Sequence, residues 1–95
     1  MRKYELALII RPNVEEEGQQ AIIDRLSGMV TGQGGQIEKV ESWGRRHLAY
    51  PIKKVNEGVY YFIQGQFPTS VLPELDRTIK LTEDILRHMV VRMDE

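Results

Sequence analysis

The 95-residue sequence predicts a single α+β domain spanning residues 1–95, with its elements in the order β-α-β-β-α-β. Segments with period-two or short apolar patterns are typical of strands, and two segments with apolar residues at helical spacing lie between them. The composition agrees, because 41% hydrophobic and 28% charged residues are ordinary proportions for a soluble globular chain of one-domain length.

The first strand is expected over residues 4–10, followed by a helix that begins near residue 15. Pro12 ends the strand, and Asn13 is a residue type suited to cap the helix. Acidic residues 15–17 then occupy the first turn, where carboxylates complement the helix dipole. The helix ends at a glycine-rich stretch, residues 32–35. Apolar residues face the core from both elements: Tyr4, Leu6, Leu8 and Ile10 from the strand, and Ile22, Ile23, Leu26, Met29 and Val30 from the helix.

The second and third strands are expected over residues 36–50 and 59–67. The spacing between Ile37 and Val40 interrupts the alternation, which predicts a bulge near residues 38–41. Pro51 places the end of the second strand at a sheet edge. Residues 53–58 predict a hairpin connection longer than the tight two-residue form.

The second helix is expected after Pro68, with Thr69 or Ser70 as its cap and Leu72, Leu75 and Ile79 as its apolar stripe. A last strand follows over residues 85–93. Right-handed crossovers put both helices on one face of a four-stranded antiparallel sheet, with the first and third strands central and the second and fourth at the edges. This is the ferredoxin-like arrangement.

The other face of that sheet has no helix to cover it. The side chains expected there are more apolar and aromatic than a solvent-facing surface requires, which predicts a binding surface. They include Glu5, Ala7, Ile9, Tyr60, Phe62, Arg87, Met89 and Val91.

Cations and aromatic residues are concentrated in residues 41–54, ESWGRRHLAYPIKK. Four cations stand against Glu41, so the segment carries a local charge of +3 in a chain whose formal net charge is -1. With Trp43 and Tyr50 among them, these cations suit phosphate binding by charge and base binding by stacking. A solvated edge strand would explain the same composition.

The sequence gives little support to enzyme chemistry. The two histidines, His47 and His88, fall on opposite edge strands, and His88 has the phase of a core-rim residue. There is no cysteine, and the chain nowhere concentrates ligands for a metal, so no metal or cofactor is expected. No apolar run is long enough to span a bilayer, and no signal peptide is recognisable. The lack of cysteine fits a reducing compartment such as a bacterial cytoplasm, which is where we expect the protein.

Three stretches, MRKYELALIIRP, ESWGRRHLAYPIKK and ILRHMVVRM, together resemble the bacterial small-subunit ribosomal protein six family. The resemblance extends over the whole chain. It implies a ferredoxin-like fold and a structural, non-enzymatic role in the small ribosomal subunit. It also implies binding to the central domain of the small-subunit rRNA as a heterodimer with small-subunit ribosomal protein eighteen.

The expected site residues follow from the resemblance and from the cationic segment. Residues that match basic or aromatic family positions are Arg2, Tyr4, Arg46, Tyr50, Lys54, Arg87 and Arg92, and the segment adds Arg45 and Lys53. All nine are expected near RNA, whereas the protein partner is expected to cover Tyr60, Phe62, Met89 and Val91. We also expect two cationic patches: one along the second strand and its hairpin, and one formed by Arg2, Arg87 and Arg92.

Two other functions are compatible with the sequence. Residues 58–62 loosely resemble the third-strand aromatic platform of RNA-recognition-motif domains, so the chain could bind single-stranded RNA without a partner, stacking bases on Tyr60 and Phe62. A dimeric ferredoxin-like enzyme of small molecules is the third hypothesis, and the sequence offers no convincing catalytic group for it. A net charge near zero suits a chain that docks beside a more basic partner better than one that binds RNA alone.

Overall fold

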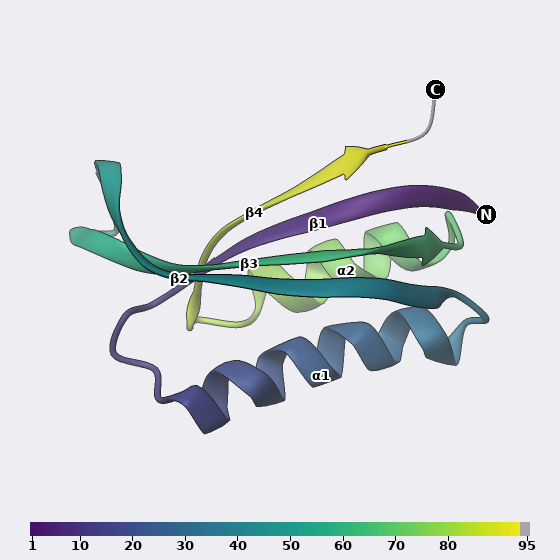
Figure 1. Cartoon of the computed structure of the whole chain (residues 1–95), viewed down its shortest axis with the longest axis horizontal. Coiled ribbons are helices and arrows are strands. Elements are labelled where there is room, and N and C mark those ends of the chain that lie inside the picture. Colours follow the sequence, from purple (N-terminus) through teal and green to yellow (C-terminus); the bar gives the residue numbers. More distant parts are fainter. Residues whose placement is uncertain (94–95) are drawn as a thin grey trace.

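The computed structural model describes residues 1–93 and confirms the predicted order of elements (Figure 1). The four strands form one antiparallel sheet in the order β2-β3-β1-β4, so β1 and β3 are central as expected. The elements are β1 (Arg2–Ile10), α1 (Glu16–Gly32), β2 (Gln36–Ile52), β3 (Val55–Phe67), α2 (Val71–Lys80) and β4 (Ile85–Arg92).

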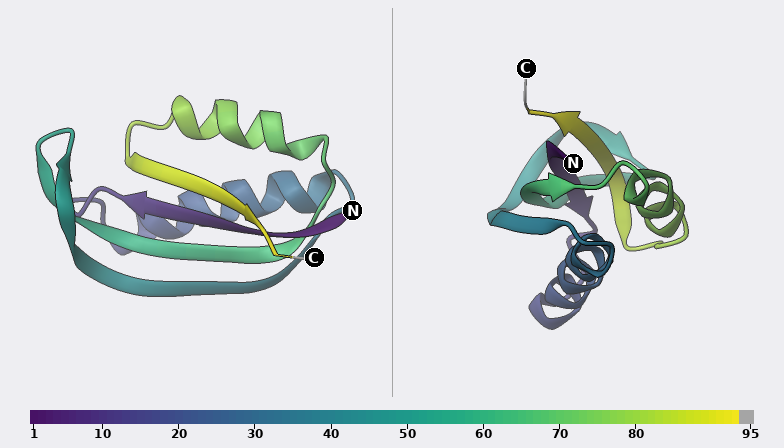
Figure 2. Two further views of the ribbon diagram at one scale, coloured as in Figure 1. Left: turned by 90° about the horizontal axis from the view of Figure 1, so that it is seen from above. Right: turned by 90° about the vertical axis from the view of Figure 1, so that its right-hand side faces the viewer.

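Both helices lie on the same side of the sheet, which leaves the opposite side open (Figure 2). The core lies between the sheet and the two helices. It is built from alternate residues of the strands and from one stripe of each helix, which is the arrangement that the sequence periodicity predicts. Its largest fully buried side chains are Leu6, Leu8, Ile10, Ile23, Leu26, Val30, Ile63, Phe67, Val71 and Leu75.

The helix starts differ from the prediction. Asn13 does not cap α1, because it lies inside a turn closed by a hydrogen bond from the Val14 amide to the Arg11 carbonyl, 3.2 Å. Glu15 occupies the N-cap position without a side-chain cap bond, and Glu16 and Glu17 fill the first turn. Ser70 is at the N-cap of α2, as expected, but its hydroxyl donates to the Gln33 side-chain oxygen, 2.8 Å, instead of capping the helix.

The connection between β2 and β3 is tighter than predicted. Ile52 pairs with Val55, so Lys53 and Lys54 form a two-residue turn, both with positive φ (51° and 67°). Positive φ at both central residues is characteristic of the type I′ hairpin turn, which usually takes Asn-Gly. The expected connection over residues 53–58 is too long, because two lysines carry no turn signal whereas Asn56 and Gly58, which belong to β3, are residue types typical of turns.

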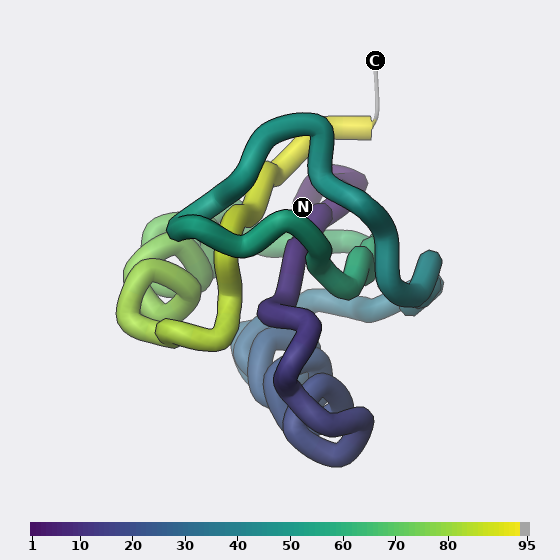
Figure 3. The backbone as a smooth tube through the Cα atoms, turned by 90° about the vertical axis from the view of Figure 1, so that its left-hand side faces the viewer, coloured from purple at the N-terminus to yellow at the C-terminus, as the bar shows by residue number. Residues whose placement is uncertain are grey.

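The β2–β3 hairpin also bends away from the helices (Figures 1 and 2). Between the pairs His47–Glu57 and Ile52–Val55, β2 has residues 48–51 where β3 has only residue 56. This surplus breaks the regular ladder, and an irregularity of this kind bends a strand and increases its twist. Viewed from its tip, the hairpin arcs over the end of the sheet toward β4 (Figure 3).

Two smaller register shifts interrupt β2. One lies between Ile37 and Lys39, inside the region where a bulge is predicted. The other lies between Ser42 and Gly44, so that Trp43 and Gly44 together face Tyr60; Gly44 has φ +73°. Only the first was expected.

No helix within residues 1–93 is long and apolar enough to cross a membrane.

Candidate interaction surface

The antiparallel register aligns the open-face residues in cross-strand rows. Ala7 lies between Phe62 on β3 and Met89 on β4, and the next row along the strands has Ile9 between Tyr60 and Arg87. The third row is Gln64–Glu5–Val91. It contains Glu5 and Val91, the last two of the eight residues expected on this face. A shallow groove of about 270 Å³ runs across the first two rows, lined by Ala7, Leu8, Ile9, Tyr60, Phe62, Arg87, His88 and Met89.

Trp43 extends this apolar surface onto β2. Its side chain is 52% exposed, and its ring centroid lies 4.7 Å from that of Phe62, with the rings tilted by 52°. Trp43 is expected from the sequence in the cationic segment, but its place on the open face is not. The Trp-Gly dipeptide was the available signal, since glycine inside a strand marks a bulge.

The Trp43 bulge determines which of the two neighbouring arginines points to the open face. A bulge adds one residue to β2 and so reverses which side chains point to each face. Arg45 is consequently opposite Val59 on the helix-covered side, and Arg46 is opposite Gly58. Arg45 donates to the Pro12 carbonyl, 2.9 Å, and its guanidinium lies 3.6 Å from the Glu57 carboxylate, so it ties β2 to the chain before α1.

Arg46 is held by Trp43 instead of by an acid. Its Nε donates to the Trp43 carbonyl, 3.1 Å, and its guanidinium carbon lies 5.9 Å from the centre of the Trp43 ring. A cation near an aromatic ring is attracted by the ring quadrupole, yet it keeps its charge for another partner. The Arg46 guanidinium is therefore held in place by Trp43, but its positive charge is not neutralised.

The bent hairpin brings a second group of residues to the same end of the sheet. A pocket of about 220 Å³ is lined by Leu48, Ala49, Tyr50 and Ile52 of the hairpin together with Ile9, Tyr60 and Arg87. Gly58 seats the hairpin on β1, because a Cβ there would lie 2.3 Å from the Ile9 Cγ2. Tyr50 is 79% exposed, and both turn lysines are exposed at the tip.

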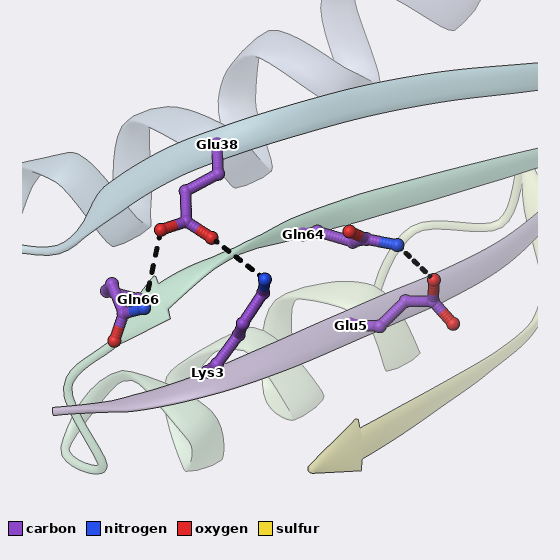
Figure 4. Close-up of polar contacts among 5 residues, drawn as sticks. All are labelled: Lys3, Glu5, Glu38, Gln64 and Gln66. Atoms are coloured by element: carbon purple, nitrogen blue, oxygen red, sulfur yellow. Dashed lines mark hydrogen bonds and ion pairs between the residues drawn. The ribbon is translucent and has the colours of Figure 1, made fainter. Parts of the chain in front are cut away.

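The opposite end of the open face is polar (Figure 4). Gln64 donates to the Glu5 carboxylate, 2.8 Å, while Glu38 accepts a hydrogen bond from Gln66, 3.3 Å, and lies 3.6 Å from the Lys3 ammonium. Each of these groups finds its partner within the sheet.

The predicted patch of Arg2, Arg87 and Arg92 is wrong. Arg87 lies opposite Ile9 on the open face near the hairpin, whereas Arg92 lies opposite Tyr4 and Arg2 lies opposite Phe67, so both are at the other end of β1. Alternation also puts Arg2 and Arg92 on the helix-covered side. Tyr4 packs against the core there, with its ring 5.8 Å from Phe67.

The histidines take part in structural contacts. His88 is partly buried, and its Nε2 lies 3.0 Å from the Asp76 carboxylate, whose other oxygen lies 2.9 Å from the Lys80 ammonium. Hydrogen bonds from Lys80 and then His88 hold the pKa of Asp76 below its ordinary value. His47 lies 3.7 Å from Glu57. Residues 1–93 contain no cluster of three or more side chains that could hold a metal ion.

Comparisons with known proteins agree on one family. The family model described as ribosomal protein S6 matches residues 3–92. The small ribosomal subunit protein bS6 of Heliobacterium modesticaldum is 43% identical to this chain, over 100% of the chain and 99% of the relative. Among solved structures, the 30S ribosomal protein S6 of Thermotoga maritima superposes with a TM-score of 0.90 at 38% identity, covering 97% of this chain and 87% of that one.

Proposed function

This chain belongs to the ribosomal protein S6 family, whose members are structural proteins of the small ribosomal subunit and not enzymes, and from that premise we propose how it binds its neighbours. It binds the central domain of the small-subunit rRNA in the cytoplasm, together with small-subunit ribosomal protein eighteen. The two ligands share the open face of the sheet.

One observation carries this proposal: at the hairpin end of the open face, an apolar groove lies beside four cations that pair with no acid in the described part of the chain. Among residues 1–93, no carboxylate pairs with Arg46, Arg87, Lys53 or Lys54. An exposed apolar surface favours a protein partner, and unpaired cations favour phosphates. The partner therefore covers Tyr60, Phe62, Met89 and Val91, and the rRNA backbone lies along the four cations and Tyr50.

The remaining expected RNA contacts divide into two groups. Arg45 and Tyr4 are engaged within the fold, Arg45 with Glu57 and the Pro12 carbonyl and Tyr4 with Phe67, so we no longer assign them to RNA. Arg2 and Arg92 lie at the other end of the sheet, and we assign them to a separate RNA segment.

Binding of the purified chain to a central-domain rRNA fragment, with and without protein eighteen and over a salt series, tests the proposal. A formal net charge of -1 predicts weak binding by the chain alone. With the partner, we expect tight binding whose logarithm falls steeply with the logarithm of the salt concentration, because phosphate contacts release counterions. If the partner leaves the affinity unchanged, the heterodimer proposal fails.

A partner-independent single-strand RNA binder is the second candidate, and the Trp43–Phe62 pair favours it. Two adjacent aromatic rings on an open sheet form a platform on which unpaired bases can stack. This function requires that the isolated chain bind single-stranded RNA tightly and that Trp43→Ala and Phe62→Ala each weaken that binding. Tight binding only in the presence of protein eighteen excludes it.

A further inference from the structure

The two edge strands of the sheet differ in how their outer sides are protected. Edge strands usually carry charges, prolines or bulges that discourage pairing with another chain. β2 has all three, with two register shifts within residues 37–44, Pro51, and charged side chains along its length. Over residues 88–91, β4 has no Asp, Glu, Lys, Arg or Pro, and it pairs with β1 in an unbroken register. β4 is therefore the less protected edge.

The second half of β4 exposes apolar side chains on both faces of the sheet. β4 begins beside α2, where Ile85 and Leu86 are buried, and it diverges from the helix toward its end (Figure 2). Met89 and Val91 are exposed on the open face. Val90 is 37% exposed on the other face, where α2 no longer covers the strand. A partner bound to the open face alone would leave Val90 uncovered.

The main-chain polar groups of Val90 point away from the sheet. The Met93 amide donates to the Lys3 carbonyl, 2.8 Å, so the main chain of Met93 faces β1. In an antiparallel pair, the polar groups of successive residues face opposite sides of the strand. Those of His88 and Val90 consequently face outward, toward a side of β4 on which the sheet of residues 1–93 has no further strand. This edge can therefore pair with a strand of another molecule.

We propose that this edge is an interface between two copies of the chain, in which the β4 strands pair antiparallel around a two-fold axis at Val90. Such an axis places Val90 opposite Val90 of the other copy, and Met89 opposite Val91. The outward main-chain groups then meet at residue 90, which is the geometry of a hydrogen-bonded pair. Apolar and β-branched side chains directly opposite one another stabilise this arrangement.

The arginine nearest the axis favours this register. Arg92 lies opposite His88 of the other copy, whose ring is 3.0 Å from the Asp76 carboxylate, so the arginine approaches an acidic group. Moving the axis by one residue in either direction would instead place Arg92 opposite Leu86 or Val90. Both of those side chains are apolar, and Leu86 is buried under α2. Only the axis at Val90 gives the arginine a polar neighbour across the interface.

The pairing gives the free chain a way to cover its exposed edge. An interface limited to residues 88–92 is small, so we expect a concentration-dependent equilibrium between monomer and dimer, not an obligate dimer. Met89 and Val91 also belong to the surface proposed for protein eighteen. The homodimer is thus a state of the chain before that partner binds.

Sedimentation equilibrium of the purified chain over a range of concentrations tests the inference, with Val90→Lys and Val90→Glu as variants. Each variant places two like charges opposite one another at the axis, so its association constant should fall roughly tenfold or more. A mixture of the two variants places Lys opposite Glu and should restore dimerisation. Val40→Lys is the matched control, because Val40 is also an exposed valine, 45%, but lies on the other edge strand, β2. It should dimerise like the wild type.

Amide hydrogen exchange of the wild-type chain, followed by NMR, needs no substitution. The outward-facing Val90 amide should become protected as the protein concentration rises. The Val91 amide, which faces β1, should be protected at every concentration. This measurement decides the question even if a charged variant fails to fold.

Three results would overturn the inference: a wild-type chain that stays monomeric at the highest concentrations used for NMR, a Val90→Lys variant that dimerises as well as the wild type, or a mixture of the two charged variants that stays monomeric. Loss of the dimer in Val40→Lys would also overturn it, by placing the interface on β2. None of these measurements involves RNA or protein eighteen, so their outcome is separate from that of the proposed function.

Discussion

The polar side chains at one end of the open sheet face are paired with one another, whereas those at the other end are not. At the end near the start of β1, Lys3, Glu5 and Glu38 are each paired with a neighbour on the sheet. At the hairpin end, neither Arg87 nor Arg46 has an acidic partner among residues 1–93, and the Arg46 guanidinium lies beside the ring and carbonyl of Trp43.

Under the proposed function, this difference distinguishes the end of the face that a ligand completes from the end that is complete without one. Exposed ion pairs such as Lys3–Glu38 contribute only about 0–1 kcal/mol each, so the paired end is not a strong source of stability. It is instead a surface whose charges are already satisfied. At the hairpin end, the apolar groove is open and the cations pair with no carboxylate of residues 1–93.

The largest expected effect comes from lifting the hairpin off the sheet. Gly58→Ala forces a Cβ to within 2.3 Å of Ile9 Cγ2, and either the hairpin or β1 must shift. We expect the free energy of unfolding to fall by roughly 1–3 kcal/mol in urea denaturation, as for other overpacked sites. Gly28→Ala is the matched control, because that helical glycine is exposed with open space around it, and it should be stabilising. Equal stability of the Gly58 variant and the wild type would show that the hairpin is not seated on Ile9.

The next largest effect is expected on partner binding, and it should differ between substitutions on the two faces of β4. Met89 is 55% exposed and lines the open-face groove, whereas its neighbour Val90 lies opposite the core residue Leu6. Met89→Ala should weaken binding of protein eighteen by about 1–2 kcal/mol, which titration calorimetry can measure. Val90→Ala should leave the affinity unchanged. Equal losses in the two variants would contradict a partner site on the open face.

A smaller effect is expected from Arg45 and Arg46, which follow the Trp43 bulge and point to opposite faces of the sheet. Arg46→Ala should reduce the salt slope of RNA binding by about one, since the proposed function gives Arg46 one phosphate contact. Arg45→Ala should leave the slope unchanged and lower stability slightly, because it loses the bond to Pro12. Lys3→Ala is a control from the paired end and should not change RNA binding. If Arg45→Ala had the larger effect on the slope, the assignment of faces would be wrong.

The smallest effect concerns pH and the helix-covered side of β4. Because Lys80 and His88 lower the pKa of Asp76 in the folded chain, its carboxylate stabilises the fold above the pKa that it has in the unfolded chain. That contribution is lost as pH falls through the lower, folded value, below about pH 4. The free energy of unfolding of Asp76→Asn should therefore lack this pH-dependent contribution in acid unfolding curves. Its binding to the partner at neutral pH should not change. A variant curve parallel to the wild-type curve at every pH would contradict it.

Most of the fold could be predicted because periodicity reports directly on burial. The strand alternation in β1 and β3 and the stripes in α1 and α2 identified the layers and the open face. The hairpin turn could not be predicted, because nothing in the Lys53-Lys54 pair favours positive φ. The Asn13 cap was wrong for a similar reason: a good capping residue also suits the tight turn in which it actually lies.

The site was harder to predict than the fold, because the face to which each site residue points depends on the phase of its strand. Arg45 and Arg46 are the same residue type at adjacent positions, and only the extra residue in β2 determines which of them reaches the open face. Arg87 and Arg92 are separated by an odd number of positions, so one strand could not present both on the same side. Counting positions would have excluded that patch from the sequence alone.

The position of Trp43 gives the chain an intrinsic optical reporter. It is the only tryptophan in the sequence, it is half-exposed, and it lies against Phe62 beside the groove. Indole emission shifts to the blue when water is removed from the ring, so a molecule that covers this end of the sheet changes the fluorescence of the unlabelled protein. Docking on the distant paired end would leave the emission unaltered, and stopped-flow emission can thus time assembly without a dye.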